Sequence, residues 1–337
     1  MKAVGYLQPL PIEHAGSLVD IDLADPVPTG RDLLVRIQAV SVNPVDTKMR
    51  RNSAPAAGEY RVLGWDAVGV VEAVGPGCRL FAPGDAVFYA GAIGRQGTNA
   101  ELHLVDERIV GRKPAMLSNA EAAAMPLTAI TAWEMLFDRL DIRKPVPGAA
   151  NAIVVIGGAG GVGSMTIQLV KALTDVAVIA TASRPETRDW VLSLGADHVI
   201  DHTKPLAQEI ARLGIGAPAF VFSTTQTDRH FDGIAEAIAP QGRFGLIDDP
   251  EPIDVRKLKR KSVSLHWELM FTRSIFGTAD MEQQHALLTE VSRLVDRGRI
   301  RTTIAEHFGT INAQNLKKAH ALLESGKAKG KIVLEGF

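Results

Sequence analysis

Hydrophobic and polar residues alternate along several short segments in the first third of the chain, and Pro-Gly turns separate these segments. Strict alternation is typical of a strand that buries one face. The pattern predicts a small, partly closed β-barrel over about the first 120 residues. The candidate strands are residues 19–23, 34–40, 68–74, 86–89 and 100–105.

The pattern changes after this region. Residues 118–137 have a helical pattern that begins with a capping box formed by Ser118 and Glu121. From Ala152 onward, short apolar strands alternate with amphipathic segments of helical length. This alternation predicts an α/β domain with a parallel, doubly wound sheet. The strand candidates after the first are residues 176–181, 198–201, 219–223 and 242–248.

The last part of the chain returns to a mixed pattern. We expect a helix over residues 281–297, a strand near Ile304, a helix over residues 316–325 and a final strand over residues 331–334.

Composition narrows the possible functions. The chain has 337 residues, is 46% hydrophobic and carries a formal net charge of −1, with no long run of one sign. These values suit about two globular domains and give no indication of nucleic-acid or membrane-surface binding. No apolar segment approaches the length of a membrane span. The single cysteine, Cys78, fits a reducing cytoplasm, because no intrachain disulfide is possible.

The strand 153–156 runs directly into the glycine-rich sequence Gly158-Ala159-Gly160-Gly161-Val162-Gly163, and a helical pattern follows. Gly158, Gly160 and Gly163 have the spacing G-x-G-x-x-G. Such a turn allows the backbone to approach a pyrophosphate at the N-terminus of a helix. The interpretation is a dinucleotide site; the alternative is a glycine turn with a structural role only.

Several motifs together resemble the medium-chain dehydrogenase/reductase superfamily, in particular its quinone oxidoreductase-like branch and zinc-type alcohol dehydrogenase-like proteins that lack zinc ligands. The resemblance covers nearly the whole chain. The motifs are residues 41–46 (SVNPVD), 63–71 (LGWDAVGVV), 126–132 (PLTAITA), 159–163 (AGGVG), 194–201 (LGADHVID) and 326–334 (GKAKGKIVL).

The resemblance implies a fold and domain boundaries. We expect a GroES-like β-barrel domain, discontinuous in sequence, formed by residues 1–126 and 273–337. The inserted domain would be a Rossmann NADP-binding domain formed by residues 127–272. It also implies a homodimer joined through the edges of the Rossmann sheets, with residues 262–266 as the candidate edge strand.

The resemblance also implies site residues. Asn43, Asp46 and Thr128 would position the cofactor and acceptor, although Asn43 and Asp46 also suit a structural role in a turn. The loops that follow the fourth and fifth Rossmann strands would contact the cofactor. The alternative is that either is simply a polar loop that does not contact it. These loops and the C-terminal strand contribute Ser223, Thr224, Ile247, Asp248 and Lys331. The acceptor pocket would be lined by Trp65, His266, Trp267 and Phe271, which equally suit a core or a dimer interface.

A catalytic zinc ion is not expected. By resemblance, the first cysteine ligand of the family falls at Asn43 and its histidine ligand falls at Trp65. Zinc needs three or four Cys, His or carboxylate ligands. Asp46 and Asp66 alone would not complete such a site, so we expect no metal.

The end of the second Rossmann strand favours NADPH over NADH. A site for NAD usually places an acid there, whereas this strand ends without one and is followed by Ser183, Arg184 and, one helical turn later, Arg188. Guanidinium groups form charge-assisted hydrogen bonds with a 2′-phosphate. The alternative is that Ser183 and Glu186 form a capping box and Arg184 is an exposed charge.

The sequence therefore predicts an NADPH-dependent, zinc-independent oxidoreductase that transfers hydride to quinones or other α,β-unsaturated carbonyl compounds. No general acid stands out; Tyr60, His266 and Lys48 are candidates without a distinguishing pattern. Two alternatives remain open: a zinc-type alcohol dehydrogenase, and a non-catalytic NADPH-binding protein.

Overall fold

The computed structural model describes all 337 residues, and the chain divides into two compact units. The first, here called the barrel unit, contains residues 1–130 and 271–337. The second, the Rossmann unit, contains residues 131–270. The expected α/β class, with a discontinuous GroES-like barrel and a parallel doubly wound sheet, is confirmed.

The barrel unit contains a three-stranded sheet, β2-β1-β4, and a seven-stranded sheet in which β15-β16-β3-β5-β6-β8 is the main path and β7 pairs with β3. Its strands are β1 (Lys2–Tyr6), β2 (Val19–Asp22), β3 (Asp32–Val42), β4 (Arg61–Val62), β5 (Asp66–Val74), β6 (Ala86–Ala90), β7 (Leu102–Asp106), β8 (Val110–Arg112), β15 (Ile304–His307) and β16 (Lys331–Glu335). Its helices are α1 (Pro44–Asn52), α2 (Asn119–Ala123), α8 (Thr272–Phe276), α9 (Gln283–Asp296) and α10 (Ala313–Glu324), with 3₁₀ turns at Ala15–Ser17 and Glu107–Ile109.

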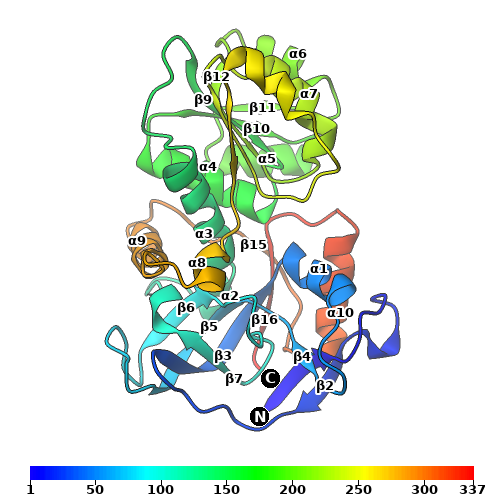
Figure 1. Ribbon diagram of the computed structural model, residues 1–337, viewed down its shortest axis with the longest axis vertical. Helices are drawn as coiled ribbons and strands as arrows, with labels where there is room; N and C mark the ends of the chain where they lie inside the picture. Colours follow the sequence, from blue (N-terminus) through cyan, green and yellow to red (C-terminus); the bar gives the residue numbers. More distant parts are fainter. The chain divides into compact units, whose positions relative to one another are not determined.

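The C-terminal segment completes the barrel unit. β16 pairs antiparallel with β3, so that Ile332 lies opposite Val42 and Leu334 lies opposite Val40; Figure 1 shows the two strands side by side. Ile332 and Leu334 are fully buried. The buried residues of β3 therefore pack in a core to which both the N-terminal and the C-terminal segments of the chain contribute.

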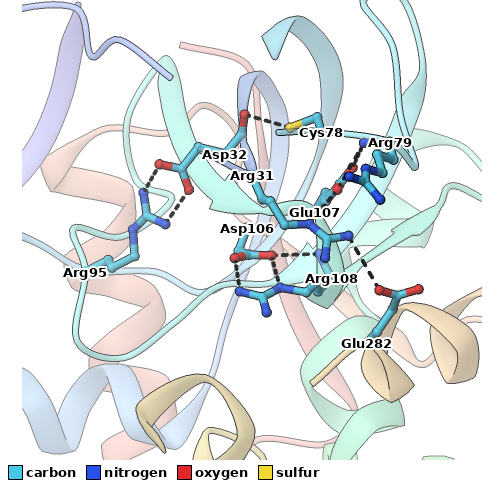
Figure 2. Close-up of polar contacts among 9 residues, drawn as sticks. All are labelled: Arg31, Asp32, Cys78, Arg79, Arg95, Asp106, Glu107, Arg108 and Glu282. Atoms are coloured by element: carbon cyan, nitrogen blue, oxygen red, sulfur yellow. Dashed lines mark hydrogen bonds and ion pairs between the residues drawn. The ribbon is translucent and has the colours of Figure 1, made fainter. Parts of the chain in front are cut away.

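Arg31 links the two segments of the barrel unit, because it contacts both the buried Glu107 and Glu282 (Figure 2). Glu107, which is fully buried, accepts hydrogen bonds from Arg31 Nε at 2.8 Å, from the Arg79 N–H and from the Leu80 N–H at 2.7 Å. Arg31 also lies 3.5 Å from Glu282, beside the start of α9. Three donors satisfy the charge of Glu107, which offsets the cost of burying it.

The Rossmann unit has a parallel six-stranded sheet in the order β11-β10-β9-β12-β13-β14. Apolar residues fill both faces of its central strands, as expected for a covered parallel sheet. Its elements are β9 (Ala150–Ile156), α4 (Gly161–Leu173), β10 (Ala177–Thr181), α5 (Pro185–Ser193), β11 (His198–Ile200), α6 (Leu206–Ala211), β12 (Pro218–Ser223), α7 (Thr227–Ala237), β13 (Arg243–Leu246), a 3₁₀ segment (Val255–Lys261) and β14 (Ser264–Trp267).

The helix expected over residues 118–137 is broken. The capping box of Ser118 and Glu121 is present, but α2 ends at Ala123, and α3 (Pro126–Trp133) begins anew at a proline. Proline lacks an N–H and clashes with the preceding turn, so a continuous helix cannot pass through this position. After α3 the chain forms a π-helix at Glu134–Arg139. Helix α1 was not expected, because its polar residues show no clear apolar stripe.

Candidate functional site

The glycine-rich turn lies between β9 and α4, as the sequence predicts. Gly157 has a φ of 79°, and a Cβ atom there would lie 2.3 Å from Thr224 Oγ1. A Cβ atom on Gly163 would lie 2.3 Å from the Gly157 carbonyl oxygen. Gly163 therefore allows helix α4 to pack directly on the turn. Gly157, which precedes the G-x-G-x-x-G motif, allows the positive φ of the turn.

The N-terminus of α4 is open to an anion. Gly160 is the N-cap residue in an extended conformation, and no side chain caps the helix there. A Cβ on Gly160 would meet nothing closer than the Gly157 carbonyl oxygen, at 3.3 Å. The first N–H groups of a helix lack intrahelical partners, so those of Gly161 and Val162 suit a pyrophosphate.

The residues expected to contact the 2′-phosphate on the ribose of NADPH lie in the turn after β10. Arg184, not Ser183, is the N-cap residue of α5, and no side chain caps the helix, so the alternative of a Ser183–Glu186 capping box is wrong. Pro185 occupies the first helical position and sets where the helix begins. Arg184 Nε instead forms an ion pair with Glu186 Oε1 at 2.9 Å. Arg188 lies one turn further on α5, with its N–H bonded to the Arg184 carbonyl.

The loops after β12 and β13 contain the other expected cofactor residues. The hydroxyl of Ser223 lies 2.7 Å from Thr227 Oγ1, and Asp248 accepts the Thr227 N–H at 2.9 Å and also its hydroxyl. Asp248 therefore caps α7, and its carboxylate is engaged within the protein. The Thr224 hydroxyl donates to the Ile156 carbonyl at 2.8 Å. Ile247 follows the end of β13 directly.

In the barrel unit, a buried polar cluster contains Asn43, Asp66 and Lys331, which we call the lysine cluster. Asn43 Nδ2 and Lys331 Nζ each donate to Asp66 Oδ2 at 2.9 Å. Lys331 Nζ also donates to Asn43 Oδ1 and to the Val42 carbonyl. The second oxygen of Asp66 accepts the Leu127 N–H at 2.7 Å. All three side chains are at most 3% exposed.

These partners determine the orientation of the Asn43 amide. Its NH₂ group donates to Asp66 and, at 3.3 Å, to the Ser41 carbonyl, while its oxygen faces the ammonium of Lys331. A flipped amide would face a carboxylate with its oxygen and an ammonium with its nitrogen. Asn43 is therefore held by the protein itself, and Lys331 is buried in the barrel unit.

Asp46 lies at the start of α1. Its carboxylate accepts the N–H of Asn43 at 2.7 Å and the N–H of Gly64 at 2.9 Å. Burial raises the pKa of Asp46 to about 7, although the two N–H donors and the nearby Lys331 oppose the shift. Asp46 thus anchors the loop that carries Gly64 and Trp65, in agreement with the structural role considered above.

Thr128 and two of the expected pocket residues also lie in the barrel unit. Thr128 is 2% exposed and donates its hydroxyl to the Met125 carbonyl at 3.0 Å. Trp65 packs edge-on against Phe271, with ring centroids 5.8 Å apart. The indole N–H of Trp65 is buried and has no hydrogen-bond partner. The sequence gives no sign of this unused donor.

The other two expected pocket residues lie on β14 in the Rossmann unit. His266 Nε2 lies 2.9 Å from the hydroxyl of Ser264, whereas the side chain of Trp267 is 55% exposed. Since β14 is the last strand of the sheet, Trp267 lies on a sheet edge. The exposure of Trp267 argues against the core alternative, and the interface alternative stays a prediction.

Sequence reasoning missed a buried carboxyl pair in the Rossmann unit. Glu268 follows β14 and lies against Glu134, at the start of the π-helix, while Arg139 Nε donates to Glu268 at 2.8 Å. Burial, and then the charge and hydrogen bond of Glu134, raise the pKa of Glu268 to about 8. Glu268 therefore keeps its proton at neutral pH.

The residues at the expected metal position do not fit a catalytic zinc ion. Asn43 and Trp65 replace the sulfur and imidazole ligands that the resemblance implies, and an ammonium already lies against the oxygens of Asn43 and Asp66. No three His, Cys, Asp or Glu side chains are grouped so as to hold a metal ion. None of the helices has the length and apolar character needed to cross a membrane.

A discontinuous GroES-like barrel and a Rossmann unit with a glycine-rich turn define a class of dinucleotide-dependent oxidoreductases. Two family models match the chain: the alcohol dehydrogenase GroES-like domain over residues 29–115, and the zinc-binding dehydrogenase family over residues 194–334. A zinc-type alcohol dehydrogenase-like protein of Staphylococcus aureus is 39% identical over 99% of both chains. The chain therefore belongs to the medium-chain dehydrogenase/reductase superfamily.

Solved structures agree with this assignment. A Rhizobium etli protein, provisionally described as a zinc-dependent alcohol dehydrogenase, is 65% identical, with a TM-score of 0.99 over 100% of this chain and 98% of that one. The quinone oxidoreductase of Pseudomonas syringae is 25% identical, with a TM-score of 0.83 over 99% of both chains. The mycobacterial protein Rv1454c, solved with NADPH, is 26% identical, with a TM-score of 0.82 over 99% of both chains.

The buried pair of Glu268 and Glu134 makes stability depend on pH. The pKa of Glu268 is raised from 4.5 to about 8, so the folded state retains a proton that the unfolded state loses. Stability therefore falls as the pH rises from about 4.5 to about 8. We expect Glu268→Gln, which stays neutral, to flatten this dependence, so that the wild type loses roughly 5 °C more in Tm than the variant between pH 5 and pH 8.

Thermal unfolding monitored by circular dichroism at several pH values measures the effect. Glu236→Gln, at an exposed position on α7, is the control and should follow the wild-type profile. Equal slopes for the wild type and Glu268→Gln would show that the pair carries no proton into the folded state.

Proposed function

We propose that the protein is an NADPH-dependent, zinc-independent reductase of quinones or other α,β-unsaturated carbonyl compounds. The observation that carries the proposal is the lysine cluster. It places an amide, a carboxylate and an ammonium where the zinc-binding members of the family would hold their metal. The names of its relatives give further support, since they include a quinone oxidoreductase and a protein solved with NADPH.

The acceptor class is inferred from Asn43 and Trp65, which stand where the resemblance places the zinc ligands of the family. An unactivated ketone needs a Lewis acid or a placed proton donor to stabilise the developing alkoxide. The buried Tyr89 hydroxyl lies 3.0 Å from His103 Nδ1, and His103 Nε2 lies 3.0 Å from the Gln96 carbonyl, so both groups are engaged. Burial also lowers the pKa of His103 to about 4, so the imidazole is neutral at pH 7.

An electron-poor acceptor removes the need for such a group. The bound dinucleotide supplies the hydride. Hydride addition to the β-carbon of an enone, or to a quinone, gives an anion delocalised onto oxygen, and solvent can supply the balancing proton.

The cofactor preference rests on the turn after β10. This turn has no acid at the strand tip, and it contains Ser183, Arg184 and Arg188. Glu186 pairs with Arg184, and both side chains are more than 40% exposed. An exposed ion pair is weak, so a 2′-phosphate can compete with Glu186 for the guanidinium.

The first test is a panel of acceptors. With the purified chain, we expect NADPH oxidation with small quinones and conjugated enones, and no reduction of NADP⁺ or NAD⁺ by ethanol. A chelator should not change these rates. Metal analysis is run on the same sample, because ethanol oxidation with bound zinc would instead indicate an alcohol dehydrogenase. NADPH binding without reduction of any acceptor would indicate a non-catalytic binding protein.

The cofactor assignment is tested by two opposite substitutions at one ion pair. Arg184→Ala should raise the KM for NADPH roughly tenfold or more, because a hydrogen bond to a charged group contributes about 1.5–3 kcal/mol. The KM for NADH should change little. Glu186→Gln releases the competing carboxylate and should lower the KM for NADPH. Equal effects of Arg184→Ala on both cofactors would contradict the assignment.

We also propose a homodimer through the exposed edge of β14. Trp267 is 55% exposed and Leu269 is 53% exposed, which is unusual for large apolar side chains beside an unpaired strand. Sedimentation velocity should give twice the 36.1 kDa mass of the chain. Leu269→Glu should produce a monomer, whereas Leu192→Glu, at a similarly exposed position on α5, should not. A monomeric wild type would contradict the proposal.

A further inference from the structure

The names of the relatives disagree with the residues of this chain. Its relatives are called zinc-type or zinc-dependent proteins, yet Asn43 and Trp65 stand where the resemblance places metal ligands. Neither side chain is a zinc ligand of the usual kind. The position must nevertheless satisfy a fully buried carboxylate, Asp66, because an isolated charge there would be very unfavourable.

Lys331 supplies the positive charge. Its Nζ donates to three oxygen atoms: the Val42 carbonyl at 3.2 Å, Asn43 Oδ1, and Asp66 Oδ2 at 2.9 Å. An ammonium group has three N–H donors, so this lysine is fully satisfied. The lysine side chain is 3% exposed and the aspartate side chain is not exposed at all.

The three oxygen atoms converge on Lys331 from different parts of the fold. Val42 ends β3, Asn43 precedes α1, and Asp66 begins β5, while Lys331 itself begins β16. The C-terminal strand therefore delivers a cation to the point where these elements meet. A divalent ion bound to the same oxygens would lie beside the ammonium, and the repulsion is strong at low dielectric constant.

We propose that Lys331 is the resident cation of this position: its ammonium holds Asn43 and Asp66 together, as a metal ion would, and prevents a divalent ion from binding the same oxygens. Lys331 is thus a positioning residue that acts through Asn43 and Asp66. The proposal rests on one part of the proposed function, the independence from zinc. It does not depend on which acceptor or which cofactor the protein uses.

The test compares stability and its response to metal in variants of the full chain. Lys331→Met leaves Asp66 buried without its cation, and Tm should fall by roughly 10 °C. Millimolar zinc or manganese should raise the Tm of Lys331→Met by partly filling the vacancy, and should leave the wild type unchanged. Lys327→Met, an exposed lysine in the same segment, is the control and should behave like the wild type.

A double variant separates charge compensation from packing. Lys331→Met/Asp66→Asn contains no unpaired charge, so it should recover most of the lost Tm and should not respond to metal. If Lys331→Met is too unstable to purify, recovery of a folded double variant supports the proposal, and failure of the double variant to fold overturns it.

Three results would overturn the inference: stoichiometric zinc in the wild type whose removal lowers Tm, equal Tm values for the single and double variants, or no response of Lys331→Met to either metal. None of these measurements uses NADPH or an acceptor. Failure of the lysine proposal is therefore distinguishable from failure of the proposed function.

Discussion

The barrel unit depends on one buried carboxylate. Asp66 lies at the start of β5, and its oxygens accept from Lys331, from Asn43 and from the N–H of Leu127. These donors come from the C-terminal strand, from the residue before α1 and from the start of α3. Because a buried charge must be compensated, a single aspartate joins segments that are far apart in the sequence. The register of β16 against β3 places the ammonium of Lys331 close to this carboxylate.

Much of the fold could be predicted because its signals are local. Alternation identified the barrel strands, and the glycine spacing placed the turn between β9 and α4. The breaks were harder to predict. Apolar periodicity continues across Ala124 and Met125, so it indicated one helix, whereas Pro126 and the π-helix divide this segment. The π-helix also depends on tertiary packing: a Cβ on Gly245 would lie 2.2 Å from Met135 Sδ, so this glycine allows the close approach.

The connections between the candidate site residues could not be predicted from the sequence. Asn43, Asp46 and Lys331 were all selected, yet only the structure brings Lys331 to Asn43, because a pairing across 288 residues leaves no local pattern. The carboxyl pair of Glu134 and Glu268 escaped notice for the same reason. The contact of Asp248 was also not predictable: it was selected as a polar residue after a strand, and the structure adds that its carboxylate accepts the N–H of Thr227 at the start of α7.

The two units solve the problem of burying charge in different ways. In the Rossmann unit, Glu268 lies against Glu134, and the raised pKa of Glu268 leaves it protonated at neutral pH, which reduces the repulsion between the two side chains. In the barrel unit, a lysine neutralises the aspartate at the position where the resemblance implies a metal ion. A metal can be lost to a chelator, whereas a lysine on a paired strand is covalently part of the fold. The contacts among Asn43, Asp66 and Lys331 thereby hold this part of the barrel together with a cation that the chain itself supplies.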